Sequence, residues 1–229
     1  WDNWGVPHIY AQSEAEMYYA FGWAQMQNHA NEIMRLYAES RGIGCEIFGE
    51  KYLQMDRLVH LYNLPDSAAA HYSRLTGDDK LFLDAFVNGL NDYAEAHPDM
   101  IDEKFKDVLP LTPVDALAHG KRVINIEFLG VRDLVLSLNE LEDIKDETLP
   151  GSNSYAIAPS KSESGNAMLV ANPHLPWSDF YLFFEAHLNA PDFNVYGVTL
   201  IGMPVLNIAF NENLGWTHTV NTIDASDRY

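Results

Sequence analysis

Hydrophobic residues in the first 130 positions recur mainly at helical spacing. The longest such stretch starts at Ser13, which stands three residues before Glu16 as in a helix capping box, and it stops at Gly42, a typical C-cap residue. Between these ends, apolar side chains return near every third or fourth residue, at Met17, Phe21, Ala24, Ile33 and Tyr37. The pattern predicts a long helix over residues 13–41.

Two further helices and a short strand complete the predicted first half. Residues 78–96 place Leu81, Ala85, Leu90 and Tyr93 on one helical face. Thr112 and Pro113 form an N-cap followed by proline at the first helical position, and this start predicts a helix that runs to about Phe128. Residues 5–11, which contain β-branched and aromatic side chains, predict a strand that tolerates its proline at a sheet edge.

The pattern changes from helical to β-type near residue 150, after the acidic segment 140–147. Apolar runs at 153–159 and 167–171, separated by a Ser/Gly/Asn turn at 162–166, predict a β-hairpin. Three later runs predict further strands, at 195–200, 205–210 and 216–220. The chain is therefore predicted to be an α+β protein with a helical first part.

Charge and composition exclude several classes of partner. Thirty-three acidic residues against 14 basic residues give a net charge of −19, which repels nucleic acids and anionic membranes. No run of eighteen apolar residues is present, so no membrane partner is expected. The single cysteine, Cys45, excludes an internal disulfide and a cysteine-rich metal cluster.

Three short motifs in the second half carry candidate chemistry. They are Gly151-Ser152-Asn153 at a strand start, Asn172-Pro173-His174 near the end of its hairpin partner, and Thr217-His218-Thr219-Val220 near a later strand end. Each is ordinary in isolation: serine after glycine is commonly a turn residue, a lone histidine is commonly structural, and valine is commonly a core residue. The three motifs are informative only when they are considered together.

With three further blocks, these motifs resemble the penicillin acylase family of N-terminal-nucleophile hydrolases, which includes acyl-homoserine lactone and aculeacin-type acylases. The further blocks are residues 5–10, residues 22–27 and Gly202-Met203-Pro204. The resemblance implies part of a four-layer αββα sandwich with a mainly helical N-terminal segment. It also implies three regions: a helical α-subunit region at 1–139, a linker end with the processing site at 140–151, and the start of a β-subunit at 152–229.

The same resemblance implies a self-cleaving amide hydrolase. Cleavage between Gly151 and Ser152 would leave Ser152 as an N-terminal nucleophile with its own α-amine as base, and no catalytic cofactor would be required. His174 is expected to orient the amine end, and the backbone amide of Val220 is expected to stabilise the oxyanion. The reaction converts an N-acyl substrate into a carboxylic acid and an amine. The family's second oxyanion donor lies beyond residue 229, so these 229 residues alone are expected to be inactive.

Binding residues and location follow from the resemblance as well. An apolar acyl pocket is expected from Phe128, Leu175, Trp177, Met203 and Leu206. A structural calcium ion is expected at Asp224, Ser226 and Asp227, aided by a carboxylate from Asp133 or Glu127; the alternative is a turn capped by its own side chains. The expected partners are a small N-acyl molecule and the rest of the β-subunit, in a heterodimer cut from one precursor, in the periplasm or secreted.

Two other functions remain open at this point. A non-catalytic, small-molecule-binding relative would keep the pocket and lack the cleavage, so N-terminal sequencing for Ser-Asn-Ser-Tyr discriminates it from the enzyme. A metal-dependent hydrolase would use His174, His187, His218 and Asp224, and it would lose activity with a chelator. The spacing of these histidines matches no metal-binding motif, so His187 and His218 are expected to be structural.

Overall fold

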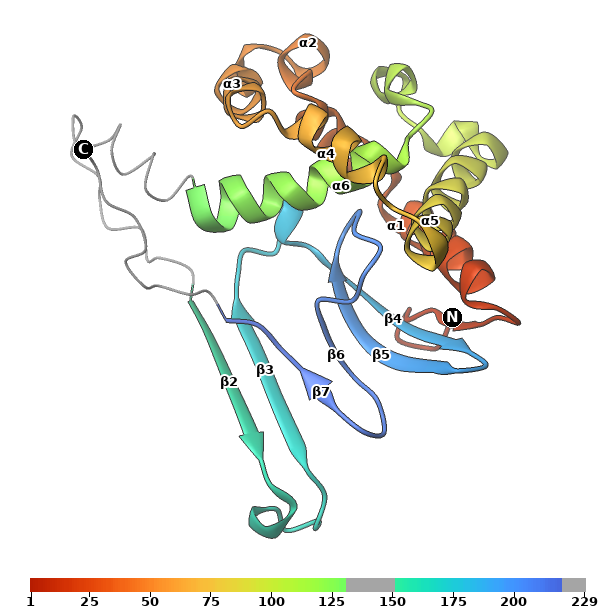
Figure 1. Ribbon diagram of the computed structural model, residues 1–229, viewed down its shortest axis with the longest axis vertical. Coiled ribbons are helices and arrows are strands. Elements are labelled where there is room, and N and C mark those ends of the chain that lie inside the picture. The colour runs from red at the N-terminus through yellow and green to blue at the C-terminus, as the bar shows by residue number, and fades with distance from the viewer. Residues whose placement is uncertain (131–150, 220–229) are drawn as a thin grey trace, which may run out of the picture.

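The computed structural model describes residues 1–130 and 151–219, and it confirms the α+β class. A five-stranded sheet has the strand order β1-β4-β5-β6-β7, and a separate two-stranded sheet pairs β2 with β3. The helices gather on one side of the five-stranded sheet, and the β2–β3 hairpin projects away from them (Figure 1). The described part of the chain thus contains one helical layer and its sheet, together with the hairpin that carries the candidate nucleophile.

The long N-terminal helix, α1 (Glu14–Arg41), begins and ends where its capping residues predict. The Ser13 hydroxyl accepts a hydrogen bond from the Glu16 amide at 3.3 Å, and the Glu16 carboxylate accepts one from the Gln12 amide at 3.0 Å. Gly42 ends the helix at φ 74°, the left-handed conformation that glycine adopts without strain. Both ends of the expected helix are confirmed, but His29 has non-helical backbone angles (φ −136°, ψ 30°) that kink the helix.

The other two predicted helices are α5 (Gly77–Ala96) and α6 (Pro113–Arg122). Thr112 and Asp115 form a complete capping box at the start of α6, and the chain continues from Arg122 into a π-helix over Val123–Gly130. The predicted inner face of α5 was wrong in one position, because Leu81 is 51% exposed. Leu81 stands nine residues, or two and a half helical turns, before the buried Leu90, so it lies on the opposite side of α5.

Several short helices were not predicted from the sequence. Each is one to three turns long, and their buried residues are too few to produce a clear period. The α-helices are α2 (Gly44–Phe48), α3 (Leu53–Leu61) and α4 (Leu64–Tyr72); the 3₁₀ segments are Glu50–Tyr52, Pro98–Met100, Glu103–Val108, Pro159–Lys161 and Asp179–Tyr181.

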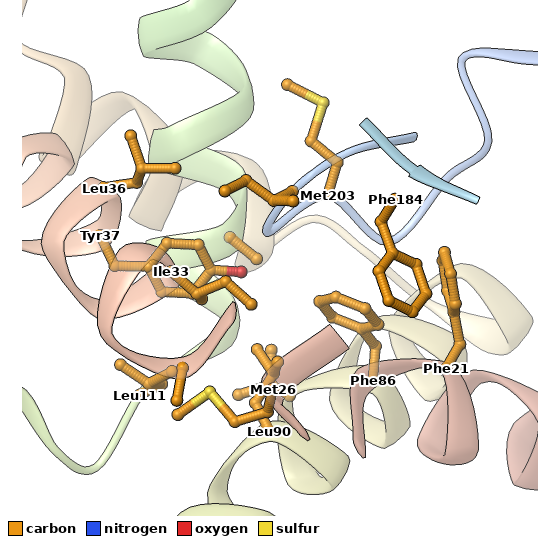
Figure 2. Close-up of a cluster of buried hydrophobic side chains, with 14 of the residues drawn as sticks. Phe21, Met26, Ile33, Leu36, Tyr37, Phe86, Leu90, Leu111, Phe184 and Met203 are labelled. Atoms are coloured by element: carbon orange, nitrogen blue, oxygen red, sulfur yellow. The ribbon is translucent and has the colours of Figure 1, made fainter. Parts of the chain in front are cut away.

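Helices α1 and α5 cross at a pair of glycines. A β-carbon on Gly22 would lie 2.0 Å from the Phe86 carbonyl oxygen, and one on Gly89 would lie 2.0 Å from the Tyr19 carbonyl oxygen. The close approach buries Phe21 and Phe86 side by side, and Figure 2 shows both rings beside Phe184 of the sheet. The two glycines therefore set the distance between these helices.

Alanine at Gly22 or Gly89 is expected to destabilise the fold by about 1–3 kcal/mol through overpacking, despite the roughly 1 kcal/mol that alanine gains in helix propensity. Gly120 in α6 is the matched control, because a β-carbon there would meet nothing within 4 Å. Gly120→Ala should leave stability unchanged or raise it. The three variants are compared by their denaturant-unfolding midpoints. Equal midpoints for all three would contradict the claim that Gly22 and Gly89 set the distance between α1 and α5.

The five-stranded sheet joins the N-terminus to the second half of the chain. β1 (His8–Tyr10) pairs in parallel with β4 (Phe183–Ala190), which is followed by antiparallel β5 (Phe193–Leu200), β6 (Ile208–Phe210) and β7 (Gly215–Trp216). β4 was not predicted, although its even-numbered residues 184–190 are buried against the helices in strict alternation.

Two predicted strands are shorter in the structure than in the sequence pattern. The run at 205–210 pairs only from Ile208, because Thr199 Oγ1 donates to the Val205 carbonyl at 2.6 Å and Asn207 Oδ1 accepts from the Leu200 amide at 2.8 Å. These side-chain bonds turn residues 205–207 into a loop. The run at 216–220 is described only to residue 219, and strand pairing there ends at Trp216.

A histidine pair links β1 to β4. His8 Nδ1 lies 3.1 Å from His187 Nδ1, while His8 Nε2 lies 3.2 Å from Asp2 Oδ2 and His187 Nε2 lies 2.7 Å from Asn194 Oδ1. The predicted structural role of His187 agrees with this position.

No helix within 1–130 or 151–219 has the length and apolar character needed to cross a membrane.

Candidate active site

Ser152 lies in the second residue pair of the hairpin. β2 (Gly151–Ile157) and β3 (Met168–His174) pair in a register that sets Gly151 opposite His174 and Ser152 opposite Pro173. Side chains of an antiparallel pair alternate between the two faces, so Ser152 and Pro173 share one face. Both line a cavity of about 450 Å³, a volume typical of small-molecule sites.

The cavity is formed where four parts of the chain meet. The π-helix supplies one wall, the hairpin and the residue after it supply a second, the sheet supplies a third, and the segment after β7 supplies the rest. Most of these side chains are apolar, and the polar ones are Ser152, Asn207, His218 and Thr219. The full lining is Val123, Ile124, Phe128, Ser152, Pro173, Leu175, Phe183, Leu200, Met203, Asn207, Ile208, His218 and Thr219.

The five expected pocket residues fall into two groups. Phe128, Leu175 and Met203 line the cavity together with Ser152. Trp177 is 96% exposed, and Leu206 packs partly buried against the main core; neither lines this cavity. Leu206 belongs to the loop over 205–207, so the strand spacing assumed for it does not apply.

Several lining residues were missed, among them His218, which the sequence placed outside the site. Asn207 offered a signal, since it is a polar residue between apolar neighbours in a predicted strand. Ile124 offered no sequence signal for the cavity beyond its place in an apolar helix. Val220, the expected oxyanion donor, lies outside the described residues, but Thr219 directly before it lines the cavity.

His174 occupies the opposite face of the hairpin from the Ser152 side chain. Its Nε2 lies 3.0 Å from Asn172 Nδ2. An amide nitrogen only donates, so Nε2 accepts this bond and a neutral His174 carries its proton on Nδ1. That Nδ1 lies 3.8 Å from the place a β-carbon on Gly151 would take. The ring is therefore beside the residue that precedes the candidate nucleophile.

Three helical side chains hold the loop that brings Met203 to the cavity. Gln25 Nε2 donates to the Met203 carbonyl at 3.0 Å, the Tyr37 hydroxyl donates to the Gly202 carbonyl at 2.7 Å, and His119 Nε2 bonds to the Ile201 carbonyl at 3.0 Å. Gly202 has φ 79°, and a β-carbon there would lie 3.1 Å from Tyr37 Cε1. The helical layer thus fixes the backbone of this cavity loop.

His119 is fully buried, and burial, reinforced by the charge of Arg122, lowers the pKa of its imidazole to about 3 from its ordinary 6.5. Between these two values the unfolded chain binds a proton that the folded chain does not. The contribution of His119 to stability is therefore complete above pH 6.5 and is lost as the pH falls toward 3.

Between pH 6.5 and 4, the unfolding free energy should fall by up to about 1.4 kcal/mol per pH unit on account of His119. His119→Gln keeps a donor near the Ile201 carbonyl and removes the titrating group, so its pH slope should be shallower by that amount. Denaturant unfolding at each pH measures the difference. Parallel slopes for the two proteins would contradict a buried neutral His119.

A buried ion-pair network supports the π-helix wall. Arg122, 1% exposed, places Nη1 2.7 Å from Glu127 Oε1 and 3.4 Å from Glu39 Oε2, while Arg35 also pairs with Glu39 and reaches Asp179. Burial raises the pKa of Glu39 and of Glu127, and Arg122 opposes that rise. The network connects α1 and α6 to the π-helix that carries Phe128.

The expected metal residues fall largely outside the described part. Asp224, Ser226, Asp227 and Asp133 all lie in the undescribed ranges, and Glu127 is ion-paired with Arg122. Within 1–130 and 151–219, no group of three or more histidine, cysteine, aspartate or glutamate side chains is placed to hold a metal ion.

Comparison with known proteins identifies the family. The penicillin amidase family matches residues 1–229, which is the whole chain. The chain therefore belongs to the penicillin amidase family. Its described elements are the helical layer, the sheet and the hairpin that carries Ser152, on which the candidate site is built.

Individual relatives match the chain over part of their own length. The acyl-homoserine lactone acylase PvdQ of Pseudomonas fluorescens is 30% identical over 260 positions, covering 99% of this chain and 33% of that protein. Aculeacin-A acylase of Actinoplanes utahensis is 40% identical over 73 positions, covering 31% of this chain and 9% of that protein. The chain spans about a third of the length of the PvdQ relatives that it matches.

Among solved structures, a thermostable penicillin G acylase from Alcaligenes faecalis aligns with a TM-score of 0.46 at 22% identity. The alignment covers 65% of this chain and 92% of that chain.

Proposed function

We propose that this chain is the front part of an amide hydrolase that is cut between Gly151 and Ser152 and then uses Ser152 as its N-terminal nucleophile. The observation that carries the proposal is the position of Ser152 at the start of β2, lining a largely apolar cavity with Phe128, Leu175 and Met203. Membership of the penicillin amidase family supports the same reaction class.

The cutting step needs no group beyond the chain and water. Ser152 Oγ attacks the Gly151 carbonyl carbon, the bond from that carbon to the Ser152 nitrogen breaks, and an ester forms. Water then hydrolyses the ester, which leaves a carboxylate on Gly151 and a free amine on Ser152. Gly151 favours this attack because it has no side chain to cover its carbonyl carbon, and it lies next to the His174 ring.

Substrate turnover repeats the same chemistry on an external amide. The free α-amine, with a typical pKa of about 7.7–8.0, takes the proton from Ser152 Oγ, which attacks the acyl carbonyl. The proton passes to the leaving amine, and water hydrolyses the acyl ester to the carboxylic acid. The Val220 amide would stabilise the oxyanion, and each such donor is typically worth about 2.7–4 kcal/mol.

The apolar cavity fits an acyl group, so the proposed substrates are N-acyl compounds with an aliphatic or aromatic acyl part. Acyl-homoserine lactones are one class that the names of the PvdQ relatives bring to the proposal. A panel of N-acyl amides and lactones, assayed with the full-length protein and with Ser152→Ala, tests it. Acyl release by wild type alone supports the proposal, and equal release by both proteins overturns it.

Calcium binding at Asp224, Ser226 and Asp227 and a periplasmic or secreted location stay predictions. Calorimetric titration of the full-length protein with Ca²⁺ tests the first, with Asp224→Ala and Asp227→Ala as the variants that should lose binding. Unchanged binding in both variants would place the ion elsewhere.

A further inference from the structure

One buried amide side chain holds the cavity loop at two points. Gln25 in α1 is 0% exposed; its Nε2 donates to the Met203 carbonyl at 3.0 Å, and its Oε1 accepts from the Gly202 amide at 2.9 Å. Both polar atoms of the side chain are thereby satisfied by a single backbone segment. A buried amide of this kind fixes its partner, because any shift leaves two buried polar groups without bonds.

We propose that Gln25 is a positioning residue that fixes the Met203 wall of the cavity and so sets which acyl chain lengths the site accepts. The inference rests on the proposed amide hydrolase function. Gln25 does not line the cavity, so it acts on the acyl group only through Met203.

Gln25 is distinguished from the other residues that hold this loop by the atom that it binds. Tyr37 and His119 bond to the carbonyls of Gly202 and Ile201, which precede Met203. The Met203 amide donates to the Leu200 carbonyl at 3.1 Å, inside the turn itself. Within the described part of the chain, Gln25 therefore makes the bond that ties Met203 directly to the helical layer.

The Met203 side chain depends on this backbone position. It lies at the edge of the core cluster and points away from Phe86 and Phe21 (Figure 2), and it lines the cavity beside Asn207. A methionine side chain is flexible and adapts to the space it is given, so its backbone rather than its shape decides where the wall lies. Moving that wall changes the depth available to an acyl chain.

Chain-length selectivity follows from this depth. Each buried methylene of an acyl chain is worth about fourfold in kcat/KM while it still finds apolar surface, and nothing once it meets the wall. With a fixed wall, kcat/KM rises with acyl chain length and stops rising at the length that reaches the wall. If the wall is displaced, that limiting length changes. If the wall is mobile, kcat/KM levels off gradually instead.

The test uses Gln25→Met, which keeps the side-chain length and removes both bonds. Asn91→Leu is the matched control, because Asn91 holds Leu111 with the same two amide bonds, each at 2.8 Å, and neither residue lines the cavity. In the full-length protein, kcat/KM is measured for a series of straight-chain N-acyl amides from butanoyl to tetradecanoyl. Gln25→Met should change the ratio between the best and the longest chain at least about fourfold, and Asn91→Leu should keep the wild-type ratio.

A double-mutant cycle shows whether Gln25 acts through Met203. In a Met203→Ala background, the effect of Gln25→Met on the chain-length ratio should disappear. A Gln25→Met protein with the wild-type ratio would overturn the inference, and so would an equal change in Asn91→Leu. An effect that persists in the Met203→Ala background would overturn it as well.

A second variant and a second measurement keep the test independent of folding and of catalysis. Gln25→Glu retains the acceptor for Gly202 and sets a carboxylate against the Met203 carbonyl, so the ratio should shift at pH 8 and return toward wild type as the new carboxyl group is protonated. Calorimetric binding of hexanoate and dodecanoate to Ser152→Ala protein gives the same selectivity without turnover. Selective binding that depends on Gln25, found together with a wild-type protein that releases no acyl product, would reject the proposed function and support the inference; the absence of any Gln25 dependence in binding would reject the inference.

Discussion

Full-length Ser152→Ala protein is expected to remain one uncut chain and to release no acyl product above background. Alanine removes the Oγ atom that attacks the Gly151 carbonyl, so neither the ester nor the new N-terminus can form. Loss of a serine nucleophile costs at least about 10⁴-fold in turnover in hydrolases of related chemistry. Denaturing gel electrophoresis and an acyl-release assay measure the two effects on the same sample.

Ser154→Ala is the matched control for this variant. Ser154 lies two residues along β2 on the same face, opposite Ala171, and it does not line the cavity. It should be cut and should turn over substrate like wild type. Cleavage or turnover by Ser152→Ala at the level of Ser154→Ala would exclude Ser152 as the nucleophile.

The second large effect is on stability. Arg122→Met should lower the unfolding free energy by about 3–5 kcal/mol, because it removes one partner of a buried ion-pair network. Glu127 would lose the guanidinium that lies 2.7 Å from its carboxylate, and Glu39 would lose one of the two arginines that it pairs with in the described part of the chain. Denaturant unfolding at pH 7 measures the loss.

The pH dependence identifies the cause of that loss. Without Arg122, burial should raise the pKa of both carboxyl groups further above the ordinary value of 4.5. A raised folded-state pKa of an acid favours the folded state at low pH, so the loss should shrink as the pH falls from 7 toward 5. Adding Glu39→Gln and Glu127→Gln should recover at least half of the loss at pH 7; no recovery would show that packing, rather than charge, causes it.

Elements with strong local signals were predictable from the sequence. Ser13 and Gly42 marked the ends of α1, and Thr112 with Pro113 marked the start of α6, because these signals depend on neighbouring residues alone. Strand β4 had an equally clear alternation, at Phe184, Ala186 and Leu188, and was overlooked. The exposure of Leu81 was predictable from the period, because nine residues, or two and a half helical turns, separate it from the buried Leu90 and the two cannot share one face of α5.

The candidate site was predictable only as far as its motifs extend. Ser152 and His174 stood out by resemblance, and the register places them in adjacent residue pairs on opposite faces of the hairpin. Gln25 and His119 carried no signal of their bonds to the Met203 loop, because their partners lie 178 and 82 residues away in the chain. Contacts of that separation depend on how the helical layer packs on the sheet.

Intact-mass analysis with N-terminal sequencing of the full-length wild-type protein tests the central claim most directly. The proposed mechanism predicts two chains, one ending at Gly151 or at a site before it and the other beginning Ser-Asn-Ser-Tyr at Ser152, and it predicts that acyl release rises with the fraction cut. A single uncut chain that releases acyl groups at full rate would contradict the account, since Ser152 would then have no free amine to act as its base.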